Sequence, residues 1–226
     1  MRYPNIRSGK FQKRPNRFIA EVALNGEVEV CHVKNTGRCR ELLVPGATVY
    51  LNEAASTTRK TRFDLIAVEK QGLLINMDAQ APNHVFREYV EQGRFLPDVT
   101  RVRPEYRWGD SRFDFYIEQG DNRHLVEVKG VTLEEEGIVR FPDAPTERGV
   151  KHIKGLTRAL NEGFTCWICF VVQMSGVQYL MPNDKTHPEF GQALRAAKAT
   201  GVHVQALECN VTPDSLTITH EIPVHL

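Results

Sequence analysis

The most informative part of the chain reads Arg112-Phe113-Asp114-Phe115-Tyr116-Ile117, followed closely by Leu125-Val126-Glu127-Val128-Lys129-Gly130. Apolar and polar residues alternate in both stretches, which is typical of β-strands. Because successive side chains of a strand point to opposite faces, Glu127 and Lys129 share one face. Asp114 lies within an otherwise aromatic strand, where a carboxylate must be paired, coordinated or placed at the rim of the sheet.

This combination of side chains suits one kind of chemistry. Two carboxylates on neighbouring strands can hold a hard divalent cation through oxygen. The cation and a nearby ammonium group then stabilise charge on a phosphate and help to generate the attacking hydroxide. We therefore predict that Asp114, Glu127 and Lys129 are the catalytic residues of a metal-dependent phosphodiesterase. The alternative for Glu-x-Lys alone is a solvated strand face, but the nearby Asp114 and the order of elements favour a site.

The composition limits the class of protein to which this site can belong. The 226 residues are 41% hydrophobic and 25% charged, which is ordinary for a folded globular protein. The polar, basic start predicts no signal peptide, and the longest apolar stretch, residues 166–172, is too short to cross a membrane. Five cysteines without a secretory signal predict free thiols and a cytoplasmic location. Cys166-x-x-Cys169 is interpreted as a core feature, because period two separates its sulfurs.

Charge is unevenly distributed along the chain. Residues 1–62 hold 12 Lys/Arg against 5 Asp/Glu, although the net charge of the whole chain is only +1. A basic N-terminal part beside an acidic remainder fits a phosphate-binding arm joined to a metal-binding body, and simple surface variation is the alternative.

The first 80 residues predict a small all-β domain. Strands are expected at 18–24, 27–33, 48–51, 62–69 and 73–77, with Asn25-Gly26 as a hairpin turn. Five short strands suggest an OB-like barrel, a fold that often binds oligonucleotides and also serves as a scaffold. Its basic loop, residues 34–40, is either a phosphate-binding segment or a solvated connection. The residues expected to contact nucleic acid here are Arg14, Arg17, Lys34, Arg38 and Arg40.

Residues 81–226 predict a mixed domain of helices and strands. A helix capped by Asn83 is followed by strands at 102–108, 112–117 and 124–128, and by a helix at 147–161 capped by Thr146. The continuously apolar strand at 164–173 is expected at the centre of a sheet. A helix at 188–200 and strands at 202–207 and 216–222 complete the chain. The order is α-β-β-β-α-β with a C-terminal extension.

The order of elements and several motifs resemble known families. The core with Asp114 and Glu127-x-Lys129 resembles the restriction-endonuclease-like nucleases. The stretches Lys34–Gly46, Arg112–Phe115, Val126–Leu133 and Phe141–His152 resemble the sugar fermentation stimulation protein family across almost the whole chain. The resemblance implies a cytoplasmic bacterial or archaeal protein with an OB-like domain at 1–80 and a nuclease-like domain at 81–226. It also implies DNA binding and a regulatory link to sugar use, especially of maltose.

The resemblance implies metal-binding and catalytic roles for particular residues of this chain. Asp114 and Glu127 are expected to hold Mg²⁺ or Mn²⁺ together with the carbonyl group of Val128, and Lys129 to position the attacking water. Glu88 is a further expected ligand from the first helix, favoured over Glu91. The nuclease pattern has a proline where this chain has Phe113, but that proline supplies no ligand. The residues expected to contact nucleic acid from the helix at 147–161 are Arg148, Lys151 and His152.

Two functions remain open at this stage. The first is a metal-dependent nuclease that binds the DNA backbone with little sequence specificity and forms a homodimer if it cuts both strands of a duplex. The second is a non-catalytic, non-specific DNA-binding protein with a regulatory role in sugar metabolism. The intact set of two carboxylates and a lysine favours the nuclease, since a protein that only binds a polyanion need not keep two carboxylates facing it.

Overall fold

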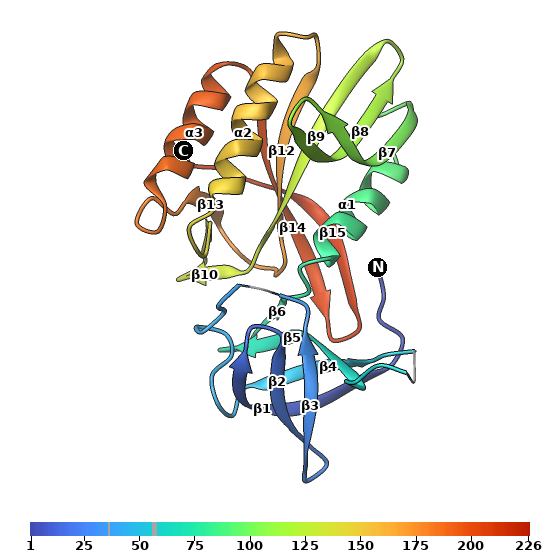
Figure 1. Ribbon diagram of the computed structural model, residues 1–226, viewed down its shortest axis with the longest axis vertical. Helices are drawn as coiled ribbons and strands as arrows, with labels where there is room; N and C mark the ends of the chain where they lie inside the picture. Colours follow the sequence, from blue (N-terminus) through green and yellow to red (C-terminus); the bar gives the residue numbers. More distant parts are fainter. Residues whose placement is uncertain (36, 56–57) are drawn as a thin grey trace.

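The chain folds into a β-barrel and an α/β domain that lie one above the other in Figure 1, in a computed structural model that describes residues 1–35, 37–55 and 58–226. The barrel is built from β1 (Ile6–Asn16), β2 (Ile19–Leu24), β3 (Glu27–Val33), β4 (Thr48–Glu53) and β5 (Phe63–Lys70). Its strand order is β3-β2-β1-β4-β5, and a parallel pairing between β3 and β5 closes it. The expected OB-like barrel of five strands is confirmed.

The membership of the barrel differs from the expectation. The long strand β1 was not expected, because Phe11 is its only fully buried residue and the others do not alternate in polarity. β6 (Leu73–Asn76) was expected within the barrel, but among the described strands it pairs with β5 alone and extends the sheet as a sixth strand. A barrel strand that exposes most of its length therefore leaves little hydrophobic signal in the sequence.

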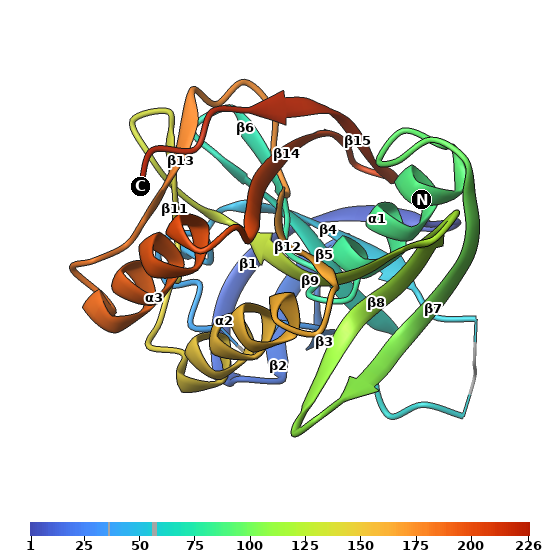
Figure 2. The same cartoon turned by 90° about the horizontal axis from the view of Figure 1, so that it is seen from above.

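The α/β domain contains a sheet of six strands in the order β15-β14-β12-β9-β8-β7. Its central strand β12 pairs in parallel with β9 and β14, as its continuous hydrophobicity predicts. Figure 2 shows α1 on one face of this sheet and α2 and α3 on the other. The elements are α1 (Ala81–Glu91), β7 (Val99–Trp108), β8 (Ser111–Gln119), β9 (Asn122–Val131), α2 (Glu147–Leu160), β12 (Thr165–Val172), α3 (Pro188–Ala199), β14 (His203–Thr212) and β15 (Ser215–Ile222).

A second, small sheet was not expected. It consists of β10 (Leu133–Glu135), β11 (Ile138–Phe141) and β13 (Tyr179–Pro182), which are too short to show a periodic pattern. The expected cap of α2 is confirmed, because Thr146 accepts a hydrogen bond of 3.1 Å from the backbone of Gly149. The expected cap of α1 is wrong: this helix begins at Ala81, and Asn83 lies in its first turn.

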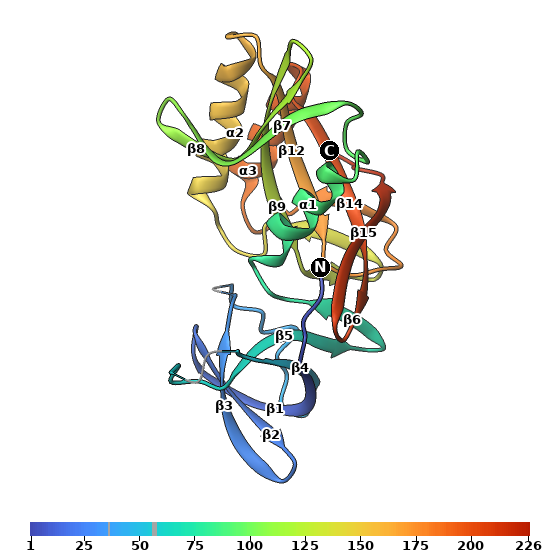
Figure 3. The ribbon, with the colours of Figure 1, turned by 90° about the vertical axis from the view of Figure 1, so that its right-hand side faces the viewer.

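The two domains are joined by hydrogen bonds at the junction seen from the side in Figure 3. The Gln173 amide donates to Asn76 Oδ1 (2.9 Å) and to the backbone oxygen of Asp78 (3.1 Å). The first residues lie against the α/β domain, where the Met1 ammonium donates to the Leu216 carbonyl and the Tyr3 amide to that of Asp214. Among the described residues, no helix is long and apolar enough to cross a membrane.

Candidate functional site

Asp114 and Glu127 lie opposite each other on adjacent strands. The antiparallel register of β8 and β9 pairs Phe115 with Val126, and one further step along both strands brings Asp114 to Glu127. β9 also presents Lys129 on the face of Glu127. The structure therefore brings together the three residues that the sequence predicts as catalytic.

Glu127 is the most buried charged group of this cluster, with a side chain that is 2% exposed. Its Oε1 accepts hydrogen bonds from the Lys129 ammonium and from Nδ1 of His152, which comes from α2. Burial raises the pKa of Glu127, but the hydrogen bond from His152 and the charge of Lys129 outweigh it, so the pKa lies below its ordinary value. Its second oxygen, Oε2, is buried and has no hydrogen-bond partner among the described residues.

Asp114 is held by one backbone and one side-chain donor. Its Oδ2 accepts from the Val128 amide (2.8 Å), and its Oδ1 accepts from the side-chain amide of Asn83 (2.9 Å). Burial and then the charge of Glu127 raise the pKa of Asp114 above its ordinary value. The two carboxylates therefore repel each other in a poorly hydrated place, which is the arrangement that a shared cation relieves.

The first helix contacts the site through a different residue than expected. Asn83 is the residue of α1 that reaches Asp114, whereas the Glu88 carboxylate pairs with the Met1 ammonium at 2.6 Å. Glu91 pairs with Arg87 one turn earlier on the helix surface. Since five residues of a helix turn through about 140°, Glu88 points away from the direction of Asn83. This geometry does not support the expected role of Glu88 as a metal ligand.

The basic residues of the barrel divide into two groups. Arg14 donates to four backbone oxygens, those of Arg17, Asn35, Gly37 and Arg38, at 2.6–2.8 Å. Lys34 pairs with Asp78 (3.3 Å) and Asp64 (3.7 Å). Both are half-buried and have their donors engaged by these protein oxygens, so the expected phosphate contact is not supported for them. Thr36, in the same loop, lies outside the described residues.

The three other arginines of the barrel that were expected to contact nucleic acid are exposed. Arg17, Arg38 and Arg40 form no ion pair with any described residue, and the guanidinium of Arg17 lies 5.8 Å from the ring of Phe18. They surround a hollow of about 420 Å³, named here the basic pocket. Its lining consists of Arg14, Asn16, Arg17, Gly37, Arg38, Arg40, Leu43 and Ala144.

The basic residues of α2 also divide. His152 is buried and contacts Glu127, so it belongs to the carboxylate cluster and not to a phosphate-binding surface. Arg148 is exposed and donates to His152 Nε2 (3.4 Å), while the exposed Lys151 lies 3.4 Å from Asp110. Arg148 therefore remains the residue of this helix that is both exposed and next to the cluster.

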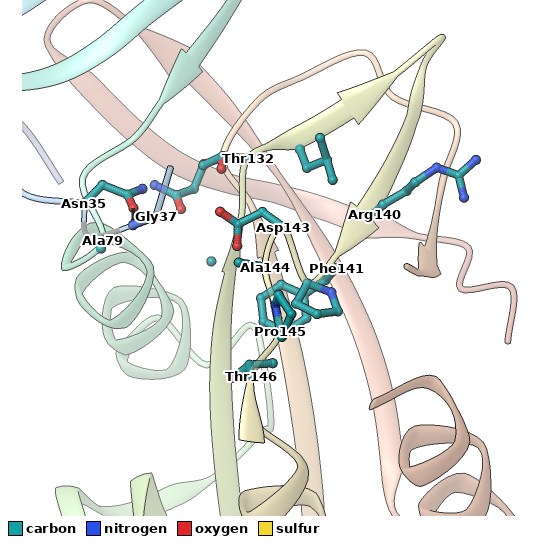
Figure 4. A pocket seen from close by; sticks show the side chains of 14 residues that line it. Asn35, Gly37, Ala79, Thr132, Arg140, Phe141, Asp143, Ala144, Pro145 and Thr146 are labelled. Carbon is teal, nitrogen blue, oxygen red and sulfur yellow. Dashed lines mark hydrogen bonds between the residues drawn. The ribbon is translucent and has the colours of Figure 1, made fainter. Parts of the chain in front are cut away.

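A second hollow of about 330 Å³, the interdomain pocket, opens where the barrel meets the α/β domain. In Figure 4 the Asp143 carboxylate points toward Asn35 and Gly37 of the barrel, with Thr132 beside it. The lining residues are Asn35, Gly37, Ala79, Gly130, Thr132, Leu133, Arg140, Phe141, Pro142, Asp143, Ala144, Pro145, Thr146 and Gln173. It shares Gly37 and Ala144 with the basic pocket, so the two hollows are contiguous.

Sequence reasoning did not identify three residues of this region. Asn83 was interpreted only as a helix cap, and Gln173 as the end of an apolar strand. Asp143 lies within the Phe141–His152 stretch that resembles the sugar fermentation stimulation family, which is the signal that pointed to this loop. Their contacts depend on how the two domains pack, and no local sequence pattern indicates this packing.

Comparisons with known proteins agree with this architecture. Residues 13–77 match the family model "SfsA N-terminal OB domain", and residues 80–215 match "Sugar fermentation stimulation protein RE domain". A "sugar fermentation stimulation protein homolog" of Desulfitobacterium hafniense is 53% identical over 226 residues, covering 100% of this chain and 99% of its own length. Another, from Clostridium beijerinckii, is 51% identical and covers 100% of both chains.

A solved structure is similar over the same length. The structure of Pyrococcus furiosus SfsA, described as a complex with Ca²⁺, has a TM-score of 0.91 and 28% sequence identity. It covers 100% of this chain and 98% of its own. Both domains, their order and their sequences therefore agree, and the chain belongs to the sugar fermentation stimulation protein family.

Proposed function

We propose that this protein is a divalent-metal-dependent phosphodiesterase that acts on DNA, with the carboxylate pair of β8 and β9 as its centre. The observation that supports this most is the buried Oε2 of Glu127, which has no hydrogen-bond partner among the described residues. It lies beside Asp114, and the pKa of Asp114 is raised by burial and by the charge of Glu127. A buried carboxylate oxygen without a donor is costly unless a cation or a water occupies its free side. Because the similar SfsA of Pyrococcus furiosus is a complex with Ca²⁺, a cation is the favoured occupant.

The residues fit a hard cation with few protein ligands. Among the described residues, no three His, Cys, Asp or Glu side chains are grouped to hold a metal, so the expected donors are Asp114, Glu127 and the carbonyl of Val128. The Val128 amide faces Asp114, and the amide and carbonyl of one strand residue point to the same side. A centre with few protein oxygens suits Mg²⁺ or Mn²⁺, because Mg²⁺ usually keeps several of its waters.

The chain's own groups have separate tasks in this proposal. A bound Mg²⁺ or Mn²⁺ supplies the Lewis acid that generates a hydroxide at neutral pH and neutralises charge on the phosphate. Lys129 places a positive charge next to the carboxylates, where it attracts the phosphate and orients the attacking water. His152 holds Glu127 in one orientation through its Nδ1, which keeps Oε2 free for the cation.

Backbone binding is the second part of the proposal. Arg17, Arg38 and Arg40 surround the basic pocket, and the exposed Arg148 lies beside the carboxylate cluster. Guanidinium groups bind phosphate oxygens in a bidentate manner and without regard to sequence. The affinity for DNA should therefore fall steeply as the salt concentration rises.

The test compares the wild type with Asp114→Ala and Asp114→Asn on labelled single-stranded, duplex and branched DNA. Cleavage and binding are scored separately in Mg²⁺, Mn²⁺ and EDTA. Asp121→Ala, in the exposed turn before β9, is the matched control for loss of one carboxylate. We expect cleavage that needs metal, disappears in both Asp114 variants and persists in the control. Unchanged cleavage in a folded Asp114→Ala would refute the assignment.

Binding without cleavage is the second candidate function. It is favoured by the ion pair within the site, because Lys129 already bonds to Glu127 and so neutralises one of the two carboxylates. On this hypothesis the protein binds DNA non-specifically and acts as a regulator of sugar use. The same experiment separates the two functions: salt-dependent binding with no product in either metal would support the binding protein.

A further inference from the structure

The interdomain pocket lies between the two parts of the proposed DNA-binding surface. On one side it adjoins the basic pocket, with which it shares Gly37 and Ala144. On the other side it is lined by Gly130, the residue after Lys129 on β9, and by Thr146, which caps the helix that carries His152. A strand whose phosphates run from the exposed arginines to the carboxylate cluster therefore passes over this pocket.

Three side chains in the pocket, Asp143, Gln173 and Thr132, have oxygens that no described side chain engages. The Asp143 carboxylate meets backbone amides of its own loop, forms no ion pair with a described side chain, and points into the pocket in Figure 4. Gln173 is 2% exposed; its amide nitrogen is used by the barrel, while its oxygen accepts no hydrogen bond from the described residues. Thr132 is 8% exposed, and its hydroxyl has no partner in the described part of the chain.

Part of the remaining lining is apolar. Phe141 and Pro145 lie below Asp143 in Figure 4, and the side chain of Arg140 extends away from them. Together with Pro142, they form an apolar wall of the pocket. At the floor, Gly130 lets Gln173 and Pro82 pack closely against the backbone, since a Cβ atom there would lie 2.5 Å from the Gln173 oxygen and 2.7 Å from Pro82. A volume of about 330 Å³ with a few convergent polar groups lies within the range of small-ligand pockets.

We propose that the interdomain pocket binds one unpaired guanine base of a single strand whose backbone lies on the basic pocket. The inference rests on the proposed function and adds a substrate class to it. Guanine presents two adjacent donors, N1–H and the N2 amino group, which match the two oxygens of Asp143. Adenine and cytosine each present only one exocyclic amino group, and thymine presents a single ring N–H. The apolar wall offers the base a face to stack on.

The experiment measures binding by fluorescence anisotropy in EDTA, so that cleavage does not interfere. The probes are short oligothymidylates with one central guanine, hypoxanthine or adenine. Hypoxanthine is a guanine that lacks only the N2 amino group, which makes it a substrate-side control that does not depend on the folding of any variant. Wild type is compared with Asp143→Asn and with Asp121→Asn, which removes the same charge at the opposite end of β9.

We expect the guanine strand to bind about tenfold more tightly than the hypoxanthine or adenine strand, the loss typical of one base contact. Asp143→Asn should abolish this preference, and Asp121→Asn should retain it. Equal affinity of all three strands for wild type would overturn the base pocket and leave the proposed function standing. No binding of any strand would overturn the single strand as the ligand, and the cleavage assay on duplex and branched DNA would then decide the proposed function separately. Guanosine monophosphate that competes as well as the guanine strand would overturn the single strand as the ligand.

Discussion

The contact between His152 and Glu127 leads to a quantitative prediction about stability. Their side chains are 7% and 2% exposed, so solvent screens the interaction little. A buried hydrogen bond to a charged group contributes about 1.5–3 kcal/mol. We therefore expect a coupling energy of that size in a double-mutant cycle of Glu127→Met, His152→Leu and the double variant. Lys129 loses its partner in both proteins that carry the Glu127→Met substitution, so that cost cancels in the cycle.

Urea unfolding followed by tryptophan fluorescence measures this coupling. Both tryptophans, Trp108 and Trp167, belong to strands of the α/β domain and report on the domain that contains the pair. With a slope of about 2 kcal/mol per molar urea, a coupling of about 2 kcal/mol corresponds to a midpoint difference of about 1 M. If the two single effects add up to the double effect within about 0.5 kcal/mol, the two residues are independent and His152 does not hold Glu127.

The same pair sets the pH dependence of stability. The pKa of Glu127 is lowered in the folded state, so its ionised form stabilises the fold above the ordinary pKa of about 4.3 for glutamate. This contribution is lost as the pH falls through the lowered pKa. In His152→Leu the pKa of Glu127 rises, because its largest favourable contact is absent, and the loss of stability should begin at a higher pH than in wild type.

Three further outcomes are expected. Arg14→Ala should lower the free energy of unfolding by about 2 kcal/mol, because the four hydrogen bonds of Arg14 to backbone oxygens are lost. Arg17→Ala should change the free energy of unfolding by less than about 0.5 kcal/mol and should weaken DNA binding. Melting curves measure the first effect and fluorescence anisotropy with labelled DNA measures the second. Gln173→Ala should speed proteolysis at residues 77–80, since its side chain joins the domains there. The five buried thiols of the native protein should not react with a disulfide reagent at pH 8, because burial raises their pKa, that of Cys39 to about 12. All five thiols should react once the protein is unfolded in urea.

The core of the candidate site could be predicted because its signal is local. Asp114 and the Glu127–Lys129 pair interrupt strands that are otherwise apolar, and a buried carboxylate in such a place requires a reason. The central position of β12 could also be predicted from a local pattern, because a strand covered on both faces is continuously apolar. The OB-like barrel followed from the number of short strands and from the turn at Asn25-Gly26.

The differences between the expectations and the structure have an equally definite physical origin. β1 was missed because a strand that exposes almost all of its side chains has no hydrophobic period. Glu88 was expected at the metal because its helix passes the site, but the side of the helix that faces Asp114 carries Asn83, and Glu88 points toward the Met1 ammonium. Arg14 and Lys34 looked like phosphate ligands because their charge is visible in the sequence, while the carbonyl and carboxylate groups that take up their hydrogen bonds are not.

The amino-acid sequence by itself determined the family, the two fold types and the carboxylate pair with its lysine, because each depends on residue type and short-range spacing. The tertiary structure alone decided which oxygen of Glu127 stays free, that His152 contacts this carboxylate, and which arginines face solvent. It also created the interdomain pocket, whose lining includes Asn35 and Gly37 of the barrel, the end of β9 and the loop at 141–146. Residues so distant along the chain meet only through the packing of the two domains, and packing is a property of the whole fold.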